Sequence, residues 1–130
     1  MAKITLCGST QFKDTFLEFN KLLTLAGNVV YSVAFFGHAD SVPLTVEEKT
    51  LLDDIHKLKI DNSEEIFVLD VNGYIGSSTQ SEIDHATKTD KAVRYLSVEY
   101  PDYKDPDEHF PQCRESGKCT GICALCYDLL

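Results

Sequence analysis

The clearest chemical feature of the sequence is Glu82, which follows a run of small and hydroxylic residues, Gly76-Ser77-Ser78-Thr79-Gln80-Ser81. This run leads into an expected helix, and a carboxylate near a helix N-terminus stays ionised. An ionised carboxylate is the form that acts as a nucleophile at the anomeric carbon of a sugar. Residues 79–82 also fit a capping box, in which Thr79 and Glu82 satisfy free backbone N–H groups. The segment therefore predicts a site residue, a helix cap, or both.

Two further segments place polar groups at the ends of expected strands. The turn Gly8-Ser9-Thr10 offers backbone N–H groups and hydroxyls to an anion or a sugar. Asp70 ends an apolar strand, where its carboxylate can hold sugar hydroxyls or the edge of a base. Each segment also has a structural interpretation, since Ser9 or Thr10 can cap a helix and Asp70 can cap the following loop. His38, in a glycine-containing loop, is a further candidate for substrate contact, whereas His56 and His85 fit solvated or locally bonded helix positions.

The last segment of the chain holds four of the five cysteines, Cys113, Cys119, Cys123 and Cys126. A structural zinc site needs four ligands in a tetrahedral arrangement. These cysteines, with His109 as an alternative ligand, match no standard zinc spacing, and only the last pair forms a CxxC. The favoured interpretation is a set of free thiols that pack as small apolar groups. We therefore expect neither a metal nor a cofactor.

The elements that must position these residues alternate between strand and helix. The expected strands are residues 3–7, 28–34, 65–70 and 92–96, and the expected helices are residues 12–26, 45–62 and a segment from about 79. This alternation predicts βαβ units and a parallel sheet. The expected fold is a Rossmann-like or flavodoxin-like three-layer α/β domain with a four- to five-stranded, mainly parallel sheet. Ligands of such sheets bind beyond the carboxyl ends of the strands, where the three polar segments fall.

Local signals define two of the helices. An apolar stripe from Phe12 to Ala26 is followed by Gly27, which is typical of a helix end. Thr45 to Glu48 form a capping box at the start of the second helix. We expect that helix to bury one face, formed by Leu51, Leu52, Ile55 and Leu58.

Size and charge bound the possible functions. The 130 residues suit one α/β domain at 1–100, followed by a cysteine-containing C-terminal tail at 101–130. The net charge of −9, from 21 acidic and 12 basic residues, disfavours a nucleic acid polymer as partner. No apolar run approaches the roughly 18 residues of a membrane span. The N-terminus reads as a strand rather than a signal peptide, so the expected compartment is the cytoplasm.

These segments together resemble the nucleoside 2-deoxyribosyltransferase-like superfamily, which includes deoxyribosyltransferases and related nucleotide N-glycoside hydrolases. The resemblance covers roughly residues 3 to 97 and rests on three short motifs in a fairly specific order. They are Gly8-Ser9-Thr10-Gln11-Phe12, Phe67-Val68-Leu69-Asp70 and Ser78-Thr79-Gln80-Ser81-Glu82-Ile83-Asp84-His85-Ala86.

The resemblance implies a role for each motif. Glu82 would attack C1′ and hold the sugar as a covalent intermediate, while Asp70 would lie beside the departing base. Gly8, Ser9 and Phe12 would line the nucleoside pocket. Sites of this family also borrow residues from a neighbouring subunit, which implies a homo-oligomer, a dimer or larger.

The 5′ end of the substrate is less defined. The resemblance implies that Ser78 and Ser81 hydrogen-bond the sugar or a 5′-phosphate. The family often has an aspartate or serine six residues before the catalytic glutamate, whereas this chain has Gly76 there, with Ser77 adjacent. Both a nucleoside and a 5′-nucleotide therefore stay open as the small-molecule substrate.

The expected activity is cleavage or transfer of the N-glycosidic bond of a (deoxy)nucleoside or 5′-nucleotide through a glutamate nucleophile. Water as the acceptor gives a hydrolase, and a second base gives a transferase. Two alternatives are a non-catalytic module that binds or senses nucleotides, in which Glu82 only caps its helix, and a glycosidase that cleaves NAD.

Overall fold

The sheet is the central layer of the molecule, and all its strands are parallel. The computed structural model describes residues 1–104 and arranges four strands in the order β2-β1-β3-β4. The strands are β1 (Lys3–Cys7), β2 (Val29–Tyr31), β3 (Glu65–Val68) and β4 (Ala92–Tyr95). The helices are α1 (Lys13–Leu25), α2 (Val46–Asp61), α3 (Ser77–Lys88) and α4 (Leu96–Glu99), with a 3-10 turn, η1 (Val71–Gly73). The expected Rossmann-like or flavodoxin-like α/β class is confirmed, with four strands.

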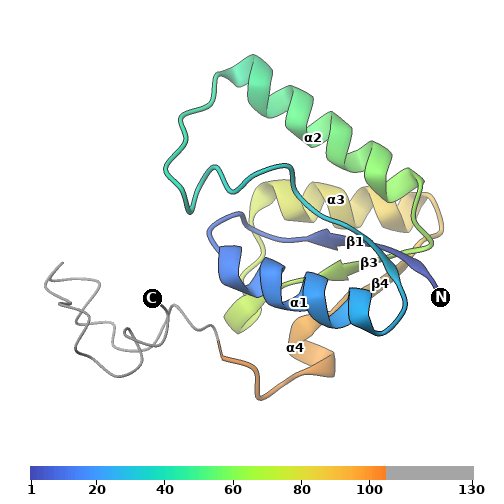
Figure 1. The fold of residues 1–130 in the computed structure, drawn as a ribbon. Helices are drawn as coiled ribbons and strands as arrows, with labels where there is room; N and C mark the ends of the chain where they lie inside the picture. The colour runs from blue at the N-terminus through green and yellow to red at the C-terminus, as the bar shows by residue number, and fades with distance from the viewer. Residues whose placement is uncertain (105–130) are drawn as a thin grey trace, which may run out of the picture.

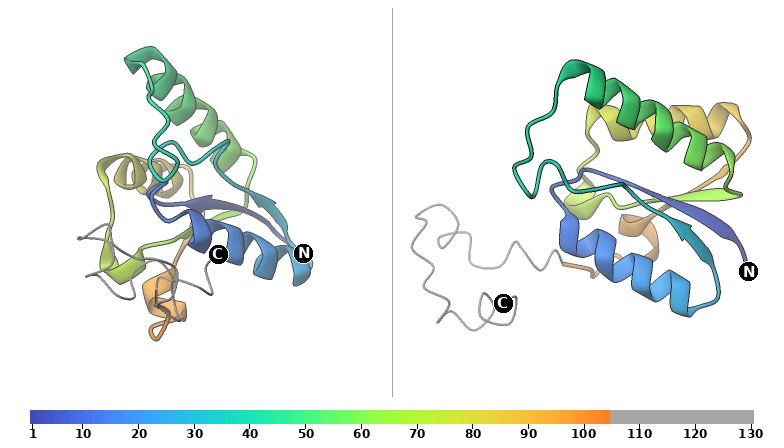
Figure 2. Two further views of the ribbon diagram at one scale, coloured as in Figure 1. Left: turned by 60° about the vertical axis from the view of Figure 1, so that its left-hand side comes forward. Right: turned by 45° about the horizontal axis from the view of Figure 1, so that its top comes forward.

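Helices cover both faces of the sheet. Figures 1 and 2 show α2 and α3 on one face and α1 and α4 on the other. The chain runs from β1 outward to β2, then crosses back to β3 beside β1 and on to β4. In this doubly wound order the direction of winding reverses between β1 and β3, which is where such folds open a crevice.

Successive side chains of a strand point to opposite faces of the sheet, so each face of the sheet has its own hydrophobic core. Ile4 and Leu6 of β1 join the core under α1, together with Phe67 of β3. Cys7 joins the core under α2 and α3, together with Ile66 and Val68 of β3. A strand with apolar side chains on both faces must be covered on both faces, which explains the continuous apolar run in β3.

The end of α1 follows the glycine signal in the sequence. Gly27 has a φ of +98°, in the left-handed region. The N–H of Gly27 bonds the carbonyl of Thr24, and the N–H of Asn28 bonds the carbonyl of Leu23. This pair of bonds is a Schellman motif, which satisfies carbonyls that the helix leaves free. It turns the chain directly into β2.

The start of α2 agrees with the capping box expected at Thr45. The buried face of this helix, however, differs from the expected one. Thr45 accepts a hydrogen bond from the N–H of Glu48 at 3.1 Å, and its own N–H donates to the Glu48 carboxylate at 3.0 Å. The predicted buried face is wrong, because Leu51 and Leu58 are more than half exposed. The residues of α2 that are buried are His56 and Ile60.

The remaining differences from the expected elements are small. β2 and β4 are shorter than predicted, and the chain enters α4 directly after Tyr95.

None of the helices within residues 1–104 is long and apolar enough to cross a membrane. Of the expected tail, residues 101–104 are described, and Tyr103 packs against α1, where its hydroxyl lies 2.8 Å from Thr15 Oγ1. Cys113, Cys119, Cys123, Cys126 and His109 lie outside the described residues.

Candidate active site

A cavity of about 410 Å³ lies beyond the carboxyl ends of β1 and β2, between α2 and α3. Its size falls within the usual range for small-molecule sites, roughly 300–1,000 Å³. Most of the residues predicted for the site line this cavity, namely Gly8, Ser9, Thr10, His38, Gly76, Ser77, Ser78 and Glu82. The structure therefore brings together the turn after β1, the loop after β2 and the start of α3.

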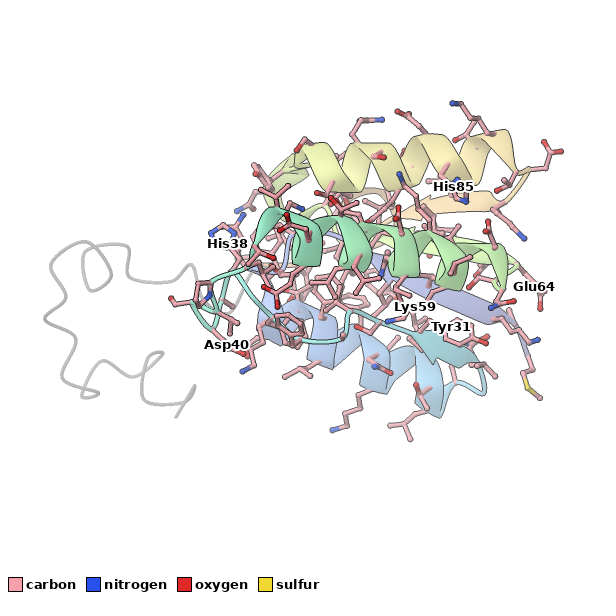
Figure 3. The ribbon with its side chains drawn as sticks, turned by 90° about the horizontal axis from the view of Figure 1, so that it is seen from above. Tyr31, His38, Asp40, Lys59, Glu64 and His85 are labelled. Carbon is pink, nitrogen blue, oxygen red and sulfur yellow. The ribbon has the colours of Figure 1, made fainter. Side chains whose placement is uncertain are left out.

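The loop between β2 and α2 forms one side of the cavity. It contributes His38, Val42 and Leu44 to the lining. The backbone N–H of His38 donates to Thr10 Oγ1 at 3.1 Å. Seen from above α2, His38 and Asp40 lie at the cavity end of the molecule, and Glu64 lies at the opposite end (Figure 3). Asp40 is tied to Lys13 of α1 by an ion pair of 3.0 Å.

Gly8 permits a close approach at the base of the cavity. A Cβ at this position would lie 3.2 Å from the carbonyl oxygen of Leu69 and 3.3 Å from its Cβ. These contacts are tighter than a side chain normally makes, so a larger residue here must displace β1 or the segment after β3. Neither Ser9 nor Thr10 is the N-cap of α1, because that helix begins at Lys13 with Phe12 before it.

Three predicted site residues lie outside the cavity lining. Phe12 is buried in the core beside α1, where its ring meets Tyr74 edge-on. Ser81 is half-buried on α3. The carboxylate of Asp70 accepts hydrogen bonds from the N–H and hydroxyl of Ser97, at 2.9 and 2.5 Å, and lines a separate small pocket beside α4. The structure does not support a shared site for Asp70 and Glu82, because both Asp70 oxygens are used to cap α4.

Glu82 lies deeper along α3 than the sequence predicted. The helix begins at Ser77 with Gly76 as its N-cap, so Glu82 falls in the second turn and makes no capping box. The predicted capping box at Thr79 is therefore wrong. Glu82 is 8% exposed and points towards β1 and α2 at the floor of the cavity. Of its two expected roles, only that of a site residue is compatible with this position.

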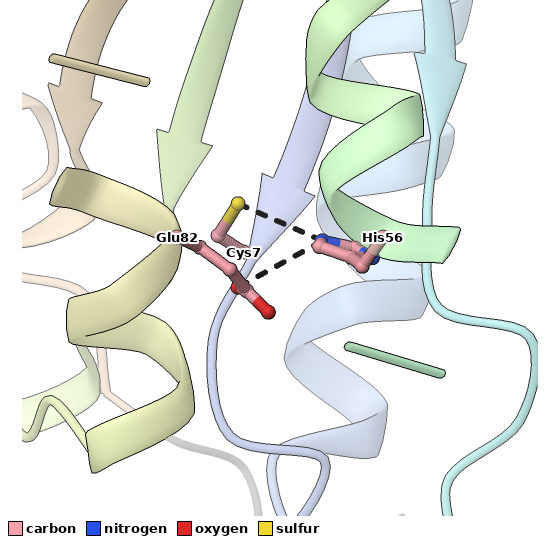
Figure 4. A group of neighbouring side chains, drawn as sticks. All are labelled: Cys7, His56 and Glu82. Carbon is pink, nitrogen blue, oxygen red and sulfur yellow. Dashed lines mark hydrogen bonds and ion pairs between the residues drawn. The ribbon is translucent and has the colours of Figure 1, made fainter. Parts of the chain in front are cut away.

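A buried cluster of Cys7, His56 and Glu82 forms around that carboxyl group (Figure 4). Each residue comes from a different element: the end of β1, the middle of α2 and the second turn of α3. His56 Nε2 lies 3.0 Å from the carbonyl oxygen of Leu6, 3.6 Å from Cys7 Sγ and 3.8 Å from Glu82 Oε1. The interpretation of His56 as a solvated helix residue is wrong, because it is 5% exposed. His85 of α3 pairs with Asp61 at the end of α2, at 2.7 Å, so its partner lies on another helix and is not local in the sequence.

Burial dominates the electrostatics of this cluster. It raises the pKa of Glu82 to about 7, against a hydrogen bond from Cys7 that lowers it. The charge of Asp53 raises this pKa further, whereas Lys49 and Lys57 lower it. Burial also lowers the pKa of His56 to about 4 and raises the pKa of the Cys7 thiol. Removing a charged group from water disfavours its charged form, which explains all three directions.

These pKa values mean that His56 and Glu82 do not form a salt bridge. His56 loses its proton near pH 4, and Glu82 loses its proton only near pH 7. Between these values both side chains are neutral, and above pH 7 only the carboxylate is charged. The expectation that Glu82 stays ionised as an ordinary carboxylate is therefore corrected, because burial raises its pKa towards neutrality.

The cluster has the atom types of a metal site. The ligand atoms of its three residues lie within 4.8 Å of one another. A carbonyl oxygen only accepts hydrogen bonds, so His56 Nε2 carries a proton and donates it to Leu6, and this nitrogen is not a metal ligand in this arrangement.

Cationic groups lie on the α2 side of the cavity. Lys49 Nζ is 2.9 Å from Ser78 Oγ and 3.5 Å from Asp53. Lys59 extends from α2 towards β2, where it donates to the carbonyl of Ser32 at 2.7 Å (Figure 3). The N-cap of α3 is Gly76, which has no side chain to cap the helix, and α3 begins beside Lys49. The lining of the cavity therefore contains two lysines, Lys49 and Lys59, together with the carboxyl groups of Asp53 and Glu82.

Sequence reasoning missed several residues of the site, including Cys7, Lys49, Asp53, His56 and Lys59. One available signal was the spacing in α2, where Lys49, Asp53 and His56 recur at steps of four and three. This spacing places them on one helix face. A polar stripe of this kind can face a cavity as readily as solvent.

Comparison with known proteins gave a negative result. Neither the family profiles, nor the curated proteins, nor the solved structures contain a match to this chain.

Proposed function

We propose that this protein cleaves or transfers the N-glycosidic bond of a nucleoside or 5′-nucleotide, with Glu82 as the nucleophile. The observation that carries the proposal is the position of Glu82, a buried carboxyl group at the floor of an open cavity beyond the carboxyl ends of parallel strands. A ligand that fills this cavity would meet the carboxylate in surroundings from which water is largely removed. There a charge that develops on a sugar ring is stabilised more strongly than in water.

The reaction follows from the chemistry of the bond. The ionised Glu82 attacks C1′, the bond between C1′ and the base nitrogen breaks, and the departing nitrogen keeps the electron pair of that bond and takes a proton from solvent. Water or a second base then attacks C1′ and loses a proton to solvent, and the bond between C1′ and Glu82 breaks to release the carboxylate. Asp53 supports this scheme as the second carboxyl group of the cavity, in place of Asp70, which is held at α4. Asp53 is our candidate for contacting the departing base.

The other cavity residues suit the remaining parts of such a substrate. Hydroxyls of Ser9 and Thr10 can hydrogen-bond a sugar. Lys49 and the uncapped N–H groups at the start of α3 favour an anion, as a 5′-phosphate would be. The apolar Val42 and Leu44 provide surface for a base. These groups favour a nucleotide over a nucleoside.

The test is a panel assay with the full chain. Ribo- and deoxyribonucleosides, their 5′-monophosphates and NAD are each incubated with the protein, with and without a second base, and free base is measured. We expect base release that falls by about three orders of magnitude in Glu82→Gln, because the nucleophile is lost. Asp84→Asn is the matched control, since Asp84 lies on the same helix but is exposed.

Three outcomes would contradict the proposal. Equal base release by wild type and Glu82→Gln would remove the role of the glutamate. Absence of release from every compound, with retained binding of a nucleotide, would favour the non-catalytic binding module instead. Release of nicotinamide from NAD alone would assign the alternative glycosidase activity.

A further inference from the structure

Three threonines are almost fully buried in the part of the chain that the structure describes, and two of them have clear partners. Thr5 donates to the carbonyl of Lys59 at 3.1 Å. Thr15 Oγ1 lies 2.8 Å from the hydroxyl of Tyr103. The third, Thr79, is 2% exposed, yet no group among the described residues forms a hydrogen bond with its hydroxyl. A buried hydroxyl without a partner costs free energy and is uncommon in folded proteins.

Thr79 lies in the first turn of α3 and lines the cavity. A threonine on a helix often satisfies its hydroxyl at the carbonyl four residues earlier. Thr87, near the end of the same helix, does so with the carbonyl of Ile83 at 2.8 Å. The hydroxyl of Thr79 makes no such bond. Because this residue is buried and borders the cavity, a ligand in the cavity can supply the partner that the protein does not.

Thr79 and Glu82 are neighbours on one face of α3, and both line the cavity. Positions three residues apart on a helix have Cβ atoms about 5–6 Å from each other. Side chains on a helix also lean towards its N-terminus, so Glu82 leans towards the turn that contains Thr79. A sugar held at the Glu82 carboxylate therefore lies within reach of the Thr79 hydroxyl.

The stereochemistry of the proposed reaction decides which sugar hydroxyl comes near. In a β-nucleotide the base projects from one face of the sugar ring, and a nucleophile that displaces it attacks C1′ from the opposite face. The 2′-hydroxyl of ribose projects from that opposite face, on the carbon bonded to C1′. The 3′-hydroxyl shares this face but lies one carbon further away. The 2′-hydroxyl is therefore the first hydroxyl that a group beside the nucleophile meets.

We propose that the Thr79 hydroxyl holds the 2′-hydroxyl of the substrate beside Glu82, so that Thr79 is a specificity-determining residue and the sugar is ribose rather than 2′-deoxyribose. This inference rests on the proposed function. A 2′-deoxy substrate leaves the buried hydroxyl of Thr79 without a partner, and a site built to bond a substrate hydroxyl discriminates against the analogue that lacks it.

The experiment compares wild type with Thr79→Val in the full chain, because valine has nearly the shape of threonine and lacks only the hydroxyl. The value of kcat/KM is measured for the ribo compound that the panel assay identifies and for its 2′-deoxy and 3′-deoxy analogues. We expect wild type to prefer the ribo over the 2′-deoxy compound by about tenfold or more. Thr79→Val should lower kcat/KM for the ribo compound by about tenfold and leave the 2′-deoxy compound little changed.

Two further variants serve as controls for the loss of the hydroxyl. Thr79→Ser keeps a hydroxyl and should keep the preference. Thr87→Val removes a threonine hydroxyl near the far end of α3 and should also keep it. Equal preferences in wild type and Thr79→Val would overturn the proposal. A preference that depends on the 3′-hydroxyl instead would overturn it as well.

Urea unfolding gives a readout that separates a ligand contact from a structural bond. Because the hydroxyl of Thr79 has no partner among the described residues, Thr79→Val should leave the urea midpoint unchanged or raise it. Thr15→Val, which removes the contact with Tyr103, should lower the midpoint. A comparable fall in Thr79→Val, or its failure to fold, would show that the hydroxyl is bonded within the protein and would overturn the proposal.

Binding of ribose 5-phosphate and 2-deoxyribose 5-phosphate, measured by calorimetry, separates this inference from the proposed function. Wild type may release no base from any compound yet bind ribose 5-phosphate more tightly, with the difference lost in Thr79→Val. The hydroxyl contact then stands and the glycosidic function falls. If base release depends on Glu82 but is equally fast from ribo and 2′-deoxy compounds in both proteins, the function stands and the contact falls.

Discussion

Burial of Glu82 opposes the charge that the proposed reaction requires of it. Its pKa of about 7 lies well above the ordinary value for a glutamate because burial disfavours the charged form. If Glu82 is the nucleophile that we propose, a substrate with positive character at C1′ would favour its ionised form. In the free protein its burial makes the ionised form costly for the fold.

The pH dependence of stability provides a direct check on this residue. A group whose folded pKa is raised contributes stability that is fully present below its unfolded pKa, here about 4.5, and is lost as pH rises through 7. Glu82→Gln removes this loss. We expect the variant to gain on the order of 2–3 kcal/mol relative to wild type between pH 4.5 and pH 8.

The measurement is urea unfolding of both proteins at several pH values. The contribution of His56 to the pH dependence of stability has the opposite sign. Because its pKa is lowered in the folded state, it adds stability as pH rises through the same region. Because His56 is present in both proteins, its own contribution cancels in the difference between their free energies of unfolding. A difference that does not change with pH would show that Glu82 titrates normally.

At the scale of the elements, α2 and the first turn of α3 meet at one corner of the cavity. The contact is Lys49 to Ser78, at 2.9 Å, beside the uncapped N–H groups of α3. We expect Lys49→Gln to lower kcat/KM for a 5′-monophosphate by about tenfold, with little change for the matching nucleoside, because one charge-assisted contact to phosphate is lost. Lys88→Gln, at the far end of α3, is the control. Equal losses for both substrates would place the phosphate elsewhere.

The elements were largely predictable because their signals are local. The capping box at Thr45 and the glycine at the end of α1 each fix a backbone hydrogen-bond pattern within a few residues, and both appear as expected. The start of α3 was misplaced by two residues because Thr79 and Glu82 have the right types and spacing for a capping box. The structure uses Gly76 as N-cap instead, and this shift places Glu82 in the core.

The site was less predictable because it depends on which face of α2 turns inward. Leu51, Leu52, Ile55 and Leu58 form the more apolar stripe, yet His56 and Ile60 are buried. The orientation of α2 follows from contacts with β1 and α3 that are distant in the sequence. Hydropathy ranks leucine above histidine for burial and contains no information about a partner such as the Leu6 carbonyl. The placement of Asp70 at Ser97 depends in the same way on a contact 27 residues away.

At the scale of the whole molecule, α2 presents apolar side chains outward. Leu51 and Leu58 are 59% and 56% exposed. We predict a homodimer or larger assembly that covers this face. Light scattering of the full chain should give at least twice the monomer mass, and Leu51→Lys with Leu58→Lys should reduce it to the monomer. A monomeric wild type at micromolar concentration would contradict the prediction.

The floor of the cavity is expected to tolerate amino-acid substitutions poorly, and its side wall is expected to tolerate them well. A side chain at position 8 would press on Leu69, and Glu82 lies on the regular helix α3. Substitutions at these two positions therefore disturb the packing around the sheet. The wall from residues 33 to 44 belongs to an irregular connection, and connections of this kind accept insertions and exchanges readily. A laboratory selection for a new leaving group should therefore randomise positions such as Val42 and Leu44 and keep the reactive centre constant.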